Sequence, residues 1–254
     1  MHEWFKTSLG QSIADAEVEK CDQLIPTAYY ANGLQVGLPG SDFLDSSGAV
    51  NRYLTDFRAL DGQIRPEGCH FVVSRSDALP FPERSQDLIV LPHTLDFCDR
   101  PHDVLRQVDQ ILEPEGCLVI VGFNAVSFYG ALKLFRNRQN PPWSGHYYSV
   151  RRVQDWLSLL DYDLVGAGMM AYQLPIQSEQ WRQRISFMEN AGDRWWPGLG
   201  GVYVIAGRKR VTAITLKPKK SRSWQRLING MAQPASQRAA RMGIKLVSKN
   251  QTEY

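Results

Sequence analysis

The sequence predicts an α/β fold built on a doubly wound, mostly parallel sheet with helices on both faces. Short apolar runs recur between residues 33 and 206, and segments with helical periodicity separate some of them. The run Asp87–Leu91 is apolar without alternation, which is typical of a strand covered on both faces. Strands that alternate with helices favour parallel pairing. An irregular insertion separates the last two runs, so we also expect an antiparallel edge strand.

These runs predict seven strands. In chain order they cover residues 33–37, 52–57, 70–74, 87–91, 117–121, 162–170 and 202–206. Leu38–Asp42, which follows the first strand, has the composition of a turn. The 40 residues from Gly37 to Asp77 are few for two strand–helix units, so we expect the third helix of the fold to be curtailed.

Two helices are expected between the later strands. The first begins near Pro101 and ends at residues 113–116, and its apolar face consists of Val104, Leu105, Val108, Ile111 and Leu112. The second begins at Ser149, a favourable N-cap, and its apolar face consists of Val150, Val153, Leu157 and Leu160. Both helices follow strands, as a parallel sheet requires.

The bulk composition is that of a globular protein in a reducing cytoplasm. Apolar residues make up 43% of the 254 residues and charged residues 22%, which allows a sizeable core. The N-terminal residues lack the apolar stretch of a signal peptide, and no apolar run approaches the ~18 residues of a membrane span. The four cysteines lie far apart, so we expect neither a disulfide framework nor a metal site.

Charge divides the chain into an acidic domain and a basic tail. Residues 208–254 hold 12 Lys or Arg and one Glu, a net charge of +11, and the other 17 basic and 25 acidic residues leave −8 for residues 1–207. We expect a domain over 1–207, with a core at 33–170 and insertions at 125–148 and 173–200. The tail is expected to be partly disordered or helical. It would be solvated, or contact a polyanion such as RNA or anionic lipid, or the acidic domain, although no specific nucleic-acid-binding motif is evident.

Two spaced segments carry a family resemblance. Residues 76–90, SDALPFPERSQDLIV, are followed at 99–118 by DRP, LRQV and ILEPEGCL. In order and spacing these elements resemble those of the small-molecule type of class I S-adenosylmethionine-dependent methyltransferases. The resemblance spans roughly residues 33–170 and is strongest over 76–122. It implies a Rossmann-like class I methyltransferase fold.

The resemblance implies S-adenosylmethionine as the cofactor, bound over the carboxyl ends of the strands. A glycine-rich loop after the first strand would allow close backbone approach, and amides at the start of the next helix would face the cofactor's carboxylate. In this sequence Gln35 stands near the usual acid of that loop, and Pro39 takes the place of its second glycine. Proline has no amide donor and fixes φ, so we expect either a reshaped loop or weak binding of the cofactor.

The family's motifs assign the cofactor contacts. Asp56 would bind the ribose, and Asp77 with Ala78 would bind the adenine edge through a carboxylate and a backbone N–H. A surface acid and a polar turn are the alternative interpretations of these positions. The full set of expected cofactor-binding residues is Gly37, Pro39, Gly40, Asp56, Asp77, Ala78, Leu79 and Pro92.

The acceptor side is expected to follow the fourth and fifth strands. His93 comes directly after the fourth strand, near the transferred methyl in this architecture, where it would be a general base or a hydrogen-bonded structural residue. Asn124, His146 and Tyr147 are the other candidates for the acceptor pocket, and aromatic packing under a lid is the alternative, which we favour for Tyr147. The tetrapeptide Asn140–Trp143 spells the NPPW of some amine methyltransferases, but it lies beyond the fifth strand. We therefore expect it to be a rigid turn.

The predicted function is methyl transfer from S-adenosylmethionine to a small organic acceptor. Such a displacement needs a positioned acceptor and sometimes a base, but no metal or nucleophilic triad. Two alternatives stay open. The altered glycine loop favours a non-catalytic binding or regulatory protein with the same fold, and the basic tail favours a protein that binds RNA or an anionic surface.

Overall fold

The computed structural model describes residues 2–57, 66–136, 140–172 and 198–210. Residues 1–211 form one compact unit of the chain. The expected tail therefore lies almost wholly outside the described residues, as does most of the insertion at 173–200. In the part of the chain that is described, no helix is both long and apolar enough to cross a membrane.

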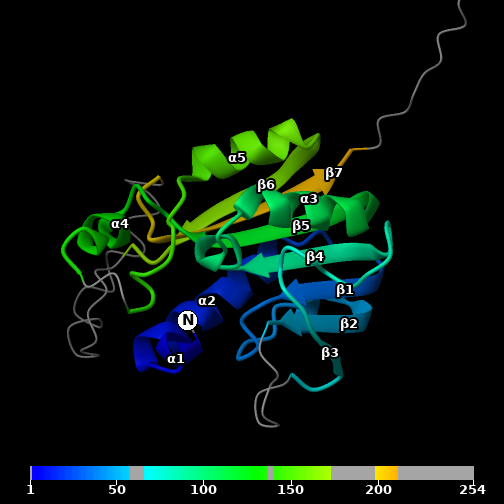
Figure 1. Cartoon of the computed structure of the whole chain (residues 1–254), viewed down its shortest axis with the longest axis horizontal. Coiled ribbons are helices and arrows are strands. Elements are labelled where there is room, and N and C mark those ends of the chain that lie inside the picture. Colours follow the sequence, from blue (N-terminus) through cyan, green and yellow to red (C-terminus); the bar gives the residue numbers. More distant parts are fainter. Residues whose placement is uncertain (1, 58–65, 137–139, 173–197, 211–254) are drawn as a thin grey trace, which may run out of the picture. The chain divides into compact units, whose positions relative to one another are not determined.

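A seven-stranded sheet forms the centre of the domain (Figure 1). Its spatial order is β3-β2-β1-β4-β5-β7-β6, and β7 is antiparallel to both of its neighbours, while the other pairs are parallel. The strands are β1 (Tyr30–Val36), β2 (Ala49–Asp56), β3 (Cys69–Val73), β4 (Gln86–Pro92), β5 (Leu112–Phe123), β6 (Tyr162–Met170) and β7 (Val202–Lys209). The expected α/β fold and its antiparallel edge are confirmed.

Alternate residues of the central strands face two separate cores. In β4, Leu88 and Val90 belong to one apolar cluster, and Ile89 and Leu91 belong to the other. This alternation follows from the pleat of a strand, and it explains why a run without polar residues is buried on both faces. Each cluster is closed by its own helices.

Helices cover the two faces of the sheet, as Figure 1 shows. On one face lie α3 (Pro101–Ile111) and α5 (Val150–Leu159), and Ser149 caps α5 by accepting a hydrogen bond from the Arg152 amide. On the other face lie α1 (His2–Phe5) and α2 (Ser8–Leu24), whose buried residues join the first cluster. The short α4 (Phe128–Lys133) follows β5.

The connections on the β1 side of the sheet are short. Only a 3-10 turn, η1 (Asp45–Ser47), lies between β1 and β2, so the expected helix start beside the glycine loop is absent from this described stretch. No helix lies between β3 and β4. The stretch from Gly37 to Asp77, whose length predicted a curtailed helix, includes residues 58–65, which lie outside the described residues. A second 3-10 turn, η2 (Leu95–Phe97), follows β4. The sheet edge at the carboxyl ends of these strands is therefore formed by loops.

Candidate functional site

The carboxyl ends of β1 to β4 lie along one edge of the sheet. The chain leaves β1 towards β2 on one side, while β4 lies on the other side of β1, so the strand order reverses between β1 and β4. Such a switch point is where open α/β sheets bind ligands. The structure thus brings Gly37, Asp56, Asp77 and Pro92 to one edge, because each of them ends or follows one of these strands.

A buried glutamine closes the loop after β1. Gln35 is 2% exposed, and its amide nitrogen donates to the carbonyls of Leu38 at 3.0 Å and Ser41 at 2.9 Å, with Gly37 at 3.1 Å. Its amide oxygen accepts a hydrogen bond from the Phe43 backbone at 3.0 Å. A carboxylate has no hydrogen to donate to carbonyls. The neutral amide is therefore what allows this loop to fold on itself.

The loop has the left-handed backbone that its glycine permits. Gly37 has φ 88° and Leu38 has φ 51°. Leu38 and Pro39 are buried, and Gly40 is exposed. The reshaped loop expected from Pro39 is thus observed as a compact turn in which Gly37 alone has the freedom of glycine at a positive φ.

Polar side chains gather where β2 and β3 end. Asp56 is buried at the end of β2, and its carbonyl accepts a hydrogen bond from the Ser74 amide at 2.9 Å. The hydroxyls of Thr55 and Ser74 are buried without a hydrogen-bond partner among the described residues. Buried hydroxyls are normally satisfied, so each of these two could still bond to a polar ligand. A ribose with its vicinal hydroxyls has the matching chemistry.

Asp77 is held by a neighbouring arginine. The Arg75 guanidinium donates to both carboxylate oxygens, at 2.8 and 2.7 Å, and this hydrogen bonding keeps the pKa of Asp77 below its usual value. The carboxylate is therefore ionised and only partly covered. The Ala78 amide donates to the Arg75 carbonyl at 3.1 Å, so in this conformation it is engaged in the turn. Leu79 is buried in the second core cluster and acts in packing.

His93 lies between two carboxylates in the interior. Its Nε2 is 2.9 Å from Glu17 Oε1, and its Nδ1 is 2.9 Å from Asp96 Oδ2. The imidazole is 0% exposed and has Phe5 and Phe123 against its ring, at centroid distances of 5.3 and 4.2 Å. Its backbone has φ 54°.

The environment of His93 favours the imidazolium. Burial alone would lower its pKa, but the Glu17 charge and the hydrogen bonds to Asp96 and Glu17 outweigh burial and raise the pKa to about 9. Burial also raises the pKa of Asp96, against the lowering effect of His93. Neither ring nitrogen is left to take a proton from an acceptor. The geometry thus departs from the expected general base and agrees with the alternative of a hydrogen-bonded structural residue.

Glu17 is the residue of this cluster that sequence reasoning missed. It lies on α2, where Leu9, Ile13, Glu17 and Cys21 recur every four residues and are all buried. Positions four apart share one face of a helix. An acid inside such an apolar stripe was the available signal, since buried carboxylates need a partner.

Two of the expected acceptor residues have other roles. Asn124 is 1% exposed, and its amide nitrogen donates to the carbonyls of Val126, Gly198 and Gly200, so it joins the end of β5 to the segment before β7. His146 is exposed, and its backbone amide donates to the Asp96 carbonyl at 2.6 Å. Neither side chain lines the cavity beside α4.

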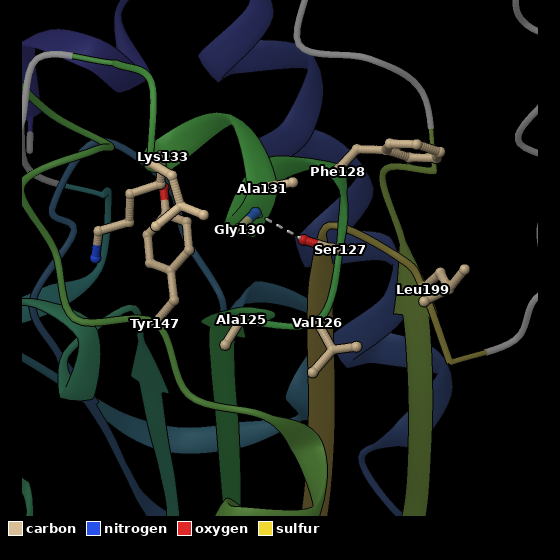
Figure 2. A pocket seen from close by; sticks show the side chains of 10 residues that line it. Ala125, Val126, Ser127, Phe128, Gly130, Ala131, Lys133, Tyr147 and Leu199 are labelled. Atoms are coloured by element: carbon tan, nitrogen blue, oxygen red, sulfur yellow. Dashed lines mark hydrogen bonds between the residues drawn. The ribbon is translucent and has the colours of Figure 1, made fainter.

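Tyr147 does line that cavity, which has a volume of about 660 Å³ (Figure 2). Its ring stacks on Phe123 at a centroid distance of 5.0 Å, and Lys133 Nζ lies 4.3 Å from the ring centroid. Its hydroxyl is buried without a hydrogen-bond partner among the described residues, and burial raises its pKa. Trp143 of the NPPW sequence stacks on Tyr129 at 6.2 Å in this same insert, far along the chain from β4.

Comparison with known proteins supports the domain type. Residues 50–120 match the family model described as a methyltransferase domain. The uncharacterized protein YafS of Escherichia coli (strain K12) is 38% identical over 143 residues, which are 56% of this chain and 56% of that protein. The chain thus matches little more than half the length of this relative. The resemblance to methyltransferases over 76–122 is confirmed by the domain match.

Solved structures share the fold. A SAM-dependent methyltransferase from Thermotoga maritima, described as a possible histamine N-methyltransferase, has a TM-score of 0.62 at 15% identity and covers 82% of this chain and 93% of its own. A second structure is the geranyl diphosphate C-methyltransferase from Streptomyces coelicolor A3(2), in complex with Mg²⁺, geranyl diphosphate and S-adenosyl-L-homocysteine. It has a TM-score of 0.55 at 13% identity, and the match covers 78% of this chain and 80% of that one. At such identities the likeness establishes the class I methyltransferase fold.

Proposed function

We propose that this chain, which has the class I methyltransferase fold, binds S-adenosylmethionine and transfers its methyl group to a small organic acceptor in the cytoplasm. The observation that carries the proposal is the row of polar groups at the ends of β2 and β3, beside the switch point. Asp56 and Asp77 supply carboxylates there, and the Thr55 and Ser74 hydroxyls are buried without partners among the described residues.

Each group has a role that fits a nucleoside. Asp56 would accept hydrogen bonds from the ribose hydroxyls. Asp77, ionised through its contact with Arg75, would accept a hydrogen bond from the adenine amine. Gly37 would let the backbone approach the amino-acid end, with Pro39 and Gly40 in the same turn. Pro92 ends β4 at the methyl-bearing end of the site.

The chain's contribution to catalysis would be positioning. When bound, the cofactor would supply a sulfonium methyl whose transfer leaves a neutral thioether. A good leaving group makes alignment of the acceptor the main requirement. His93 would hold η2 and β5 in place through Asp96, whose carboxylate also accepts a hydrogen bond from the Phe123 amide at 2.9 Å. A proton released by the acceptor would then pass to the solvent or to a group on the acceptor side.

The experiment that tests the proposal is a calorimetric titration with S-adenosylhomocysteine, the product form of the cofactor. We expect saturable heat with one site per chain, together with a rise in Tm, because a ligand that binds only the native state stabilises it. The absence of both heat and a Tm shift at millimolar ligand would overturn the proposal. Methyl transfer would then be followed with a labelled cofactor over acceptor panels. One neighbour of the same fold methylates geranyl diphosphate and another is described as a possible histamine methyltransferase, so the fold does not define the acceptor.

A second candidate is a binding or regulatory protein without turnover. It is favoured by the loop after β1, which Gln35 closes on itself, and by His93, which has no free ring nitrogen. This candidate predicts cofactor binding without product, or no binding. Any methylated product would exclude it.

The polyanion contact predicted for residues 208–254 stays a prediction. Arg208 and Lys209 lie in β7, and from residue 211 the tail is outside the described residues. Deleting residues 211–254 and measuring binding to RNA over a salt series would test it, because phosphate contacts weaken steeply with salt.

A further inference from the structure

The cavity beside α4 is apolar and open to the surface. Six apolar side chains contribute to its lining: Ala125, Val126, Phe128, Ala131, Leu134 and Leu199. Figure 2 shows α4 above the cavity, with Tyr147 and Leu199 on opposite sides of it. Among the described residues of the lining, Lys133 is the only charged one, and none is an acid. A site of this composition suits a ligand with an apolar body.

The surface around the cavity is also apolar. Phe135 is 86% exposed and Leu134 69%, and Val126, Phe128 and Leu199 are exposed as well. Single exposed apolar residues need no explanation, but a group of them around an apolar cavity marks an interaction site. We call these five residues the α4 patch.

The charge of this region is opposite to that of the remaining domain. Residues 116–154 contain no Asp or Glu, and the segment 125–148 carries three cations, namely Lys133, Arg136 and Arg138, within a domain whose net charge is −8. Arg136 is exposed and lies over the Trp143 ring at 5.9 Å. Apolar side chains combined with cations and without acids are typical of surfaces that bind anionic lipid.

We propose that the α4 patch binds an anionic lipid membrane and that the cavity takes up an amphipathic, lipid-like acceptor from it. The inference deepens the proposed methyl transfer, on which the acceptor role rests. The acceptor's apolar chain would lie along Val126 and Leu134. Its polar head would face the Tyr147 hydroxyl, which is buried without a partner among the described residues.

Vesicle flotation of the full chain tests the surface. Vesicles of phosphatidylglycerol and phosphatidylcholine are compared with vesicles of phosphatidylcholine alone. We expect binding to the anionic vesicles, and the double variant Leu134→Gln, Phe135→Gln should lower the partition coefficient by about tenfold or more. The matched control is Tyr29→Gln, Leu159→Gln, which removes two residues that are 80% and 82% exposed, before β1 and at the end of α5, and should bind as the wild type does.

The charge is tested in the same assay. Arg136→Gln should weaken binding to anionic vesicles about fivefold, as expected for one basic residue near such a surface, while Arg106→Gln on α3 should not. All these variants keep the basic tail, so adsorption through the tail alone would leave the patch variants unchanged. Wild-type binding by Leu134→Gln, Phe135→Gln, or equal binding to neutral vesicles, would overturn the proposal.

Binding of oleate below its critical micelle concentration tests the cavity. We expect saturable quenching of tryptophan fluorescence, several-fold weaker in Tyr147→Phe because the hydrogen bond to the carboxylate is lost. An unchanged affinity in Tyr147→Phe, or no binding by the wild type, would overturn this part. If the protein binds S-adenosylhomocysteine but neither vesicles nor oleate, the lipid proposal is wrong and the proposed function stands. If it binds vesicles and oleate but not S-adenosylhomocysteine, the proposed function is wrong.

Discussion

His93 and Glu17 form a buried pair across 76 residues of sequence, with Nε2 and Oε1 2.9 Å apart and both side chains 0% exposed. The pair fixes α2 to the end of β4. On the opposite side of the ring, Nδ1 bonds to the Asp96 carboxylate, which also accepts a hydrogen bond from the Phe123 amide at the end of β5. One imidazole therefore connects three parts of the chain beside the candidate site.

Glu17→Gln is expected to destabilise the domain by about 1–3 kcal/mol, because the charged hydrogen bond at His93 Nε2 is replaced by a neutral one, while Asp96 still pairs with the other ring nitrogen. Chemical denaturation at pH 7 measures the change. Glu19→Gln is the matched control, because Glu19 lies on the same helix and is exposed, with Gln23 as its side-chain partner among the described residues. Equal stabilities of the two variants would mean that the pair does not hold α2.

The stability of the wild type should fall as the pH rises from about 6.5 to about 9. The folded state raises the His93 pKa to about 9, against ~6.5 in an unfolded chain. A group whose pKa is raised by folding stabilises the folded state fully at a pH below its unfolded pKa. This contribution, about 3 kcal/mol for His93, is lost as the pH rises past the folded pKa. The raised pKa of Asp96 acts in the same direction at lower pH. Denaturation midpoints at pH 6, 7, 8 and 9 should show the decline, and Glu17→Gln should flatten it.

The strands were predictable because burial on both faces leaves a plain signal. Seven apolar runs became seven strands, and the last antiparallel pair was predicted from the irregular insertion between its two strands. Boundaries were less accurate. β5 begins at Leu112, where a helix end was expected, since Gln86 pairs with Leu112 across a bulge. The start of β5 depends on its register with β4, and the apolar pattern of one segment does not determine that register.

The site was harder to predict, because its geometry depends on partners distant in sequence. The motif around Asp77 pointed to the edge of the sheet at the carboxyl ends of the strands, and the structure places this residue there, after β3. His93 was identified as a candidate, but its burial depends on α1 and α2, which the analysis of periodicity had not assigned. Gln35 looked like a defect of the glycine loop, whereas its four hydrogen bonds make it the centre of that loop.

Gln35→Glu should destabilise the domain by about 2–4 kcal/mol, although it restores the acid that related methyltransferases carry near this position. The carboxylate would face the carbonyls of Leu38 and Ser41 without a hydrogen to donate, which leaves buried acceptors unsatisfied. Thermal unfolding measures the effect. Gln11→Glu, on the exposed side of α2, is the control. A Gln35→Glu variant as stable as the wild type would show that the loop opens easily.

Asp77→Ala should weaken binding of S-adenosylhomocysteine by about 10- to 100-fold, the loss of one charged hydrogen bond to the adenine amine. Its effect on unfolding should be small, because the contact with Arg75 is largely solvent-exposed. Titration calorimetry gives the first quantity and thermal unfolding the second. Asp103→Ala on α3, whose carboxylate pairs with exposed Arg106, is the control and should bind as the wild type does. If both variants bind equally, the adenine lies elsewhere.

Gly201→Ala should destabilise the domain by about 1–3 kcal/mol through overpacking. An added Cβ would lie 2.5 Å from Tyr129 Cδ2 and 2.8 Å from the Ala171 carbonyl oxygen. Tyr129 cannot easily yield, because it is buried and stacks on both Phe123 and Trp143. Gly198→Ala is the matched control, since a Cβ there meets nothing within 4 Å.

Thermal unfolding should separate these two glycine variants, with Tm lower by about 2 °C or more in Gly201→Ala alone. Tyr129 belongs to α4, so its displacement should also disturb the cavity beside that helix. Gly201→Ala should therefore bind oleate less well than Gly198→Ala. A variant with lowered Tm and unchanged oleate affinity would show that the cavity does not depend on the packing of Tyr129.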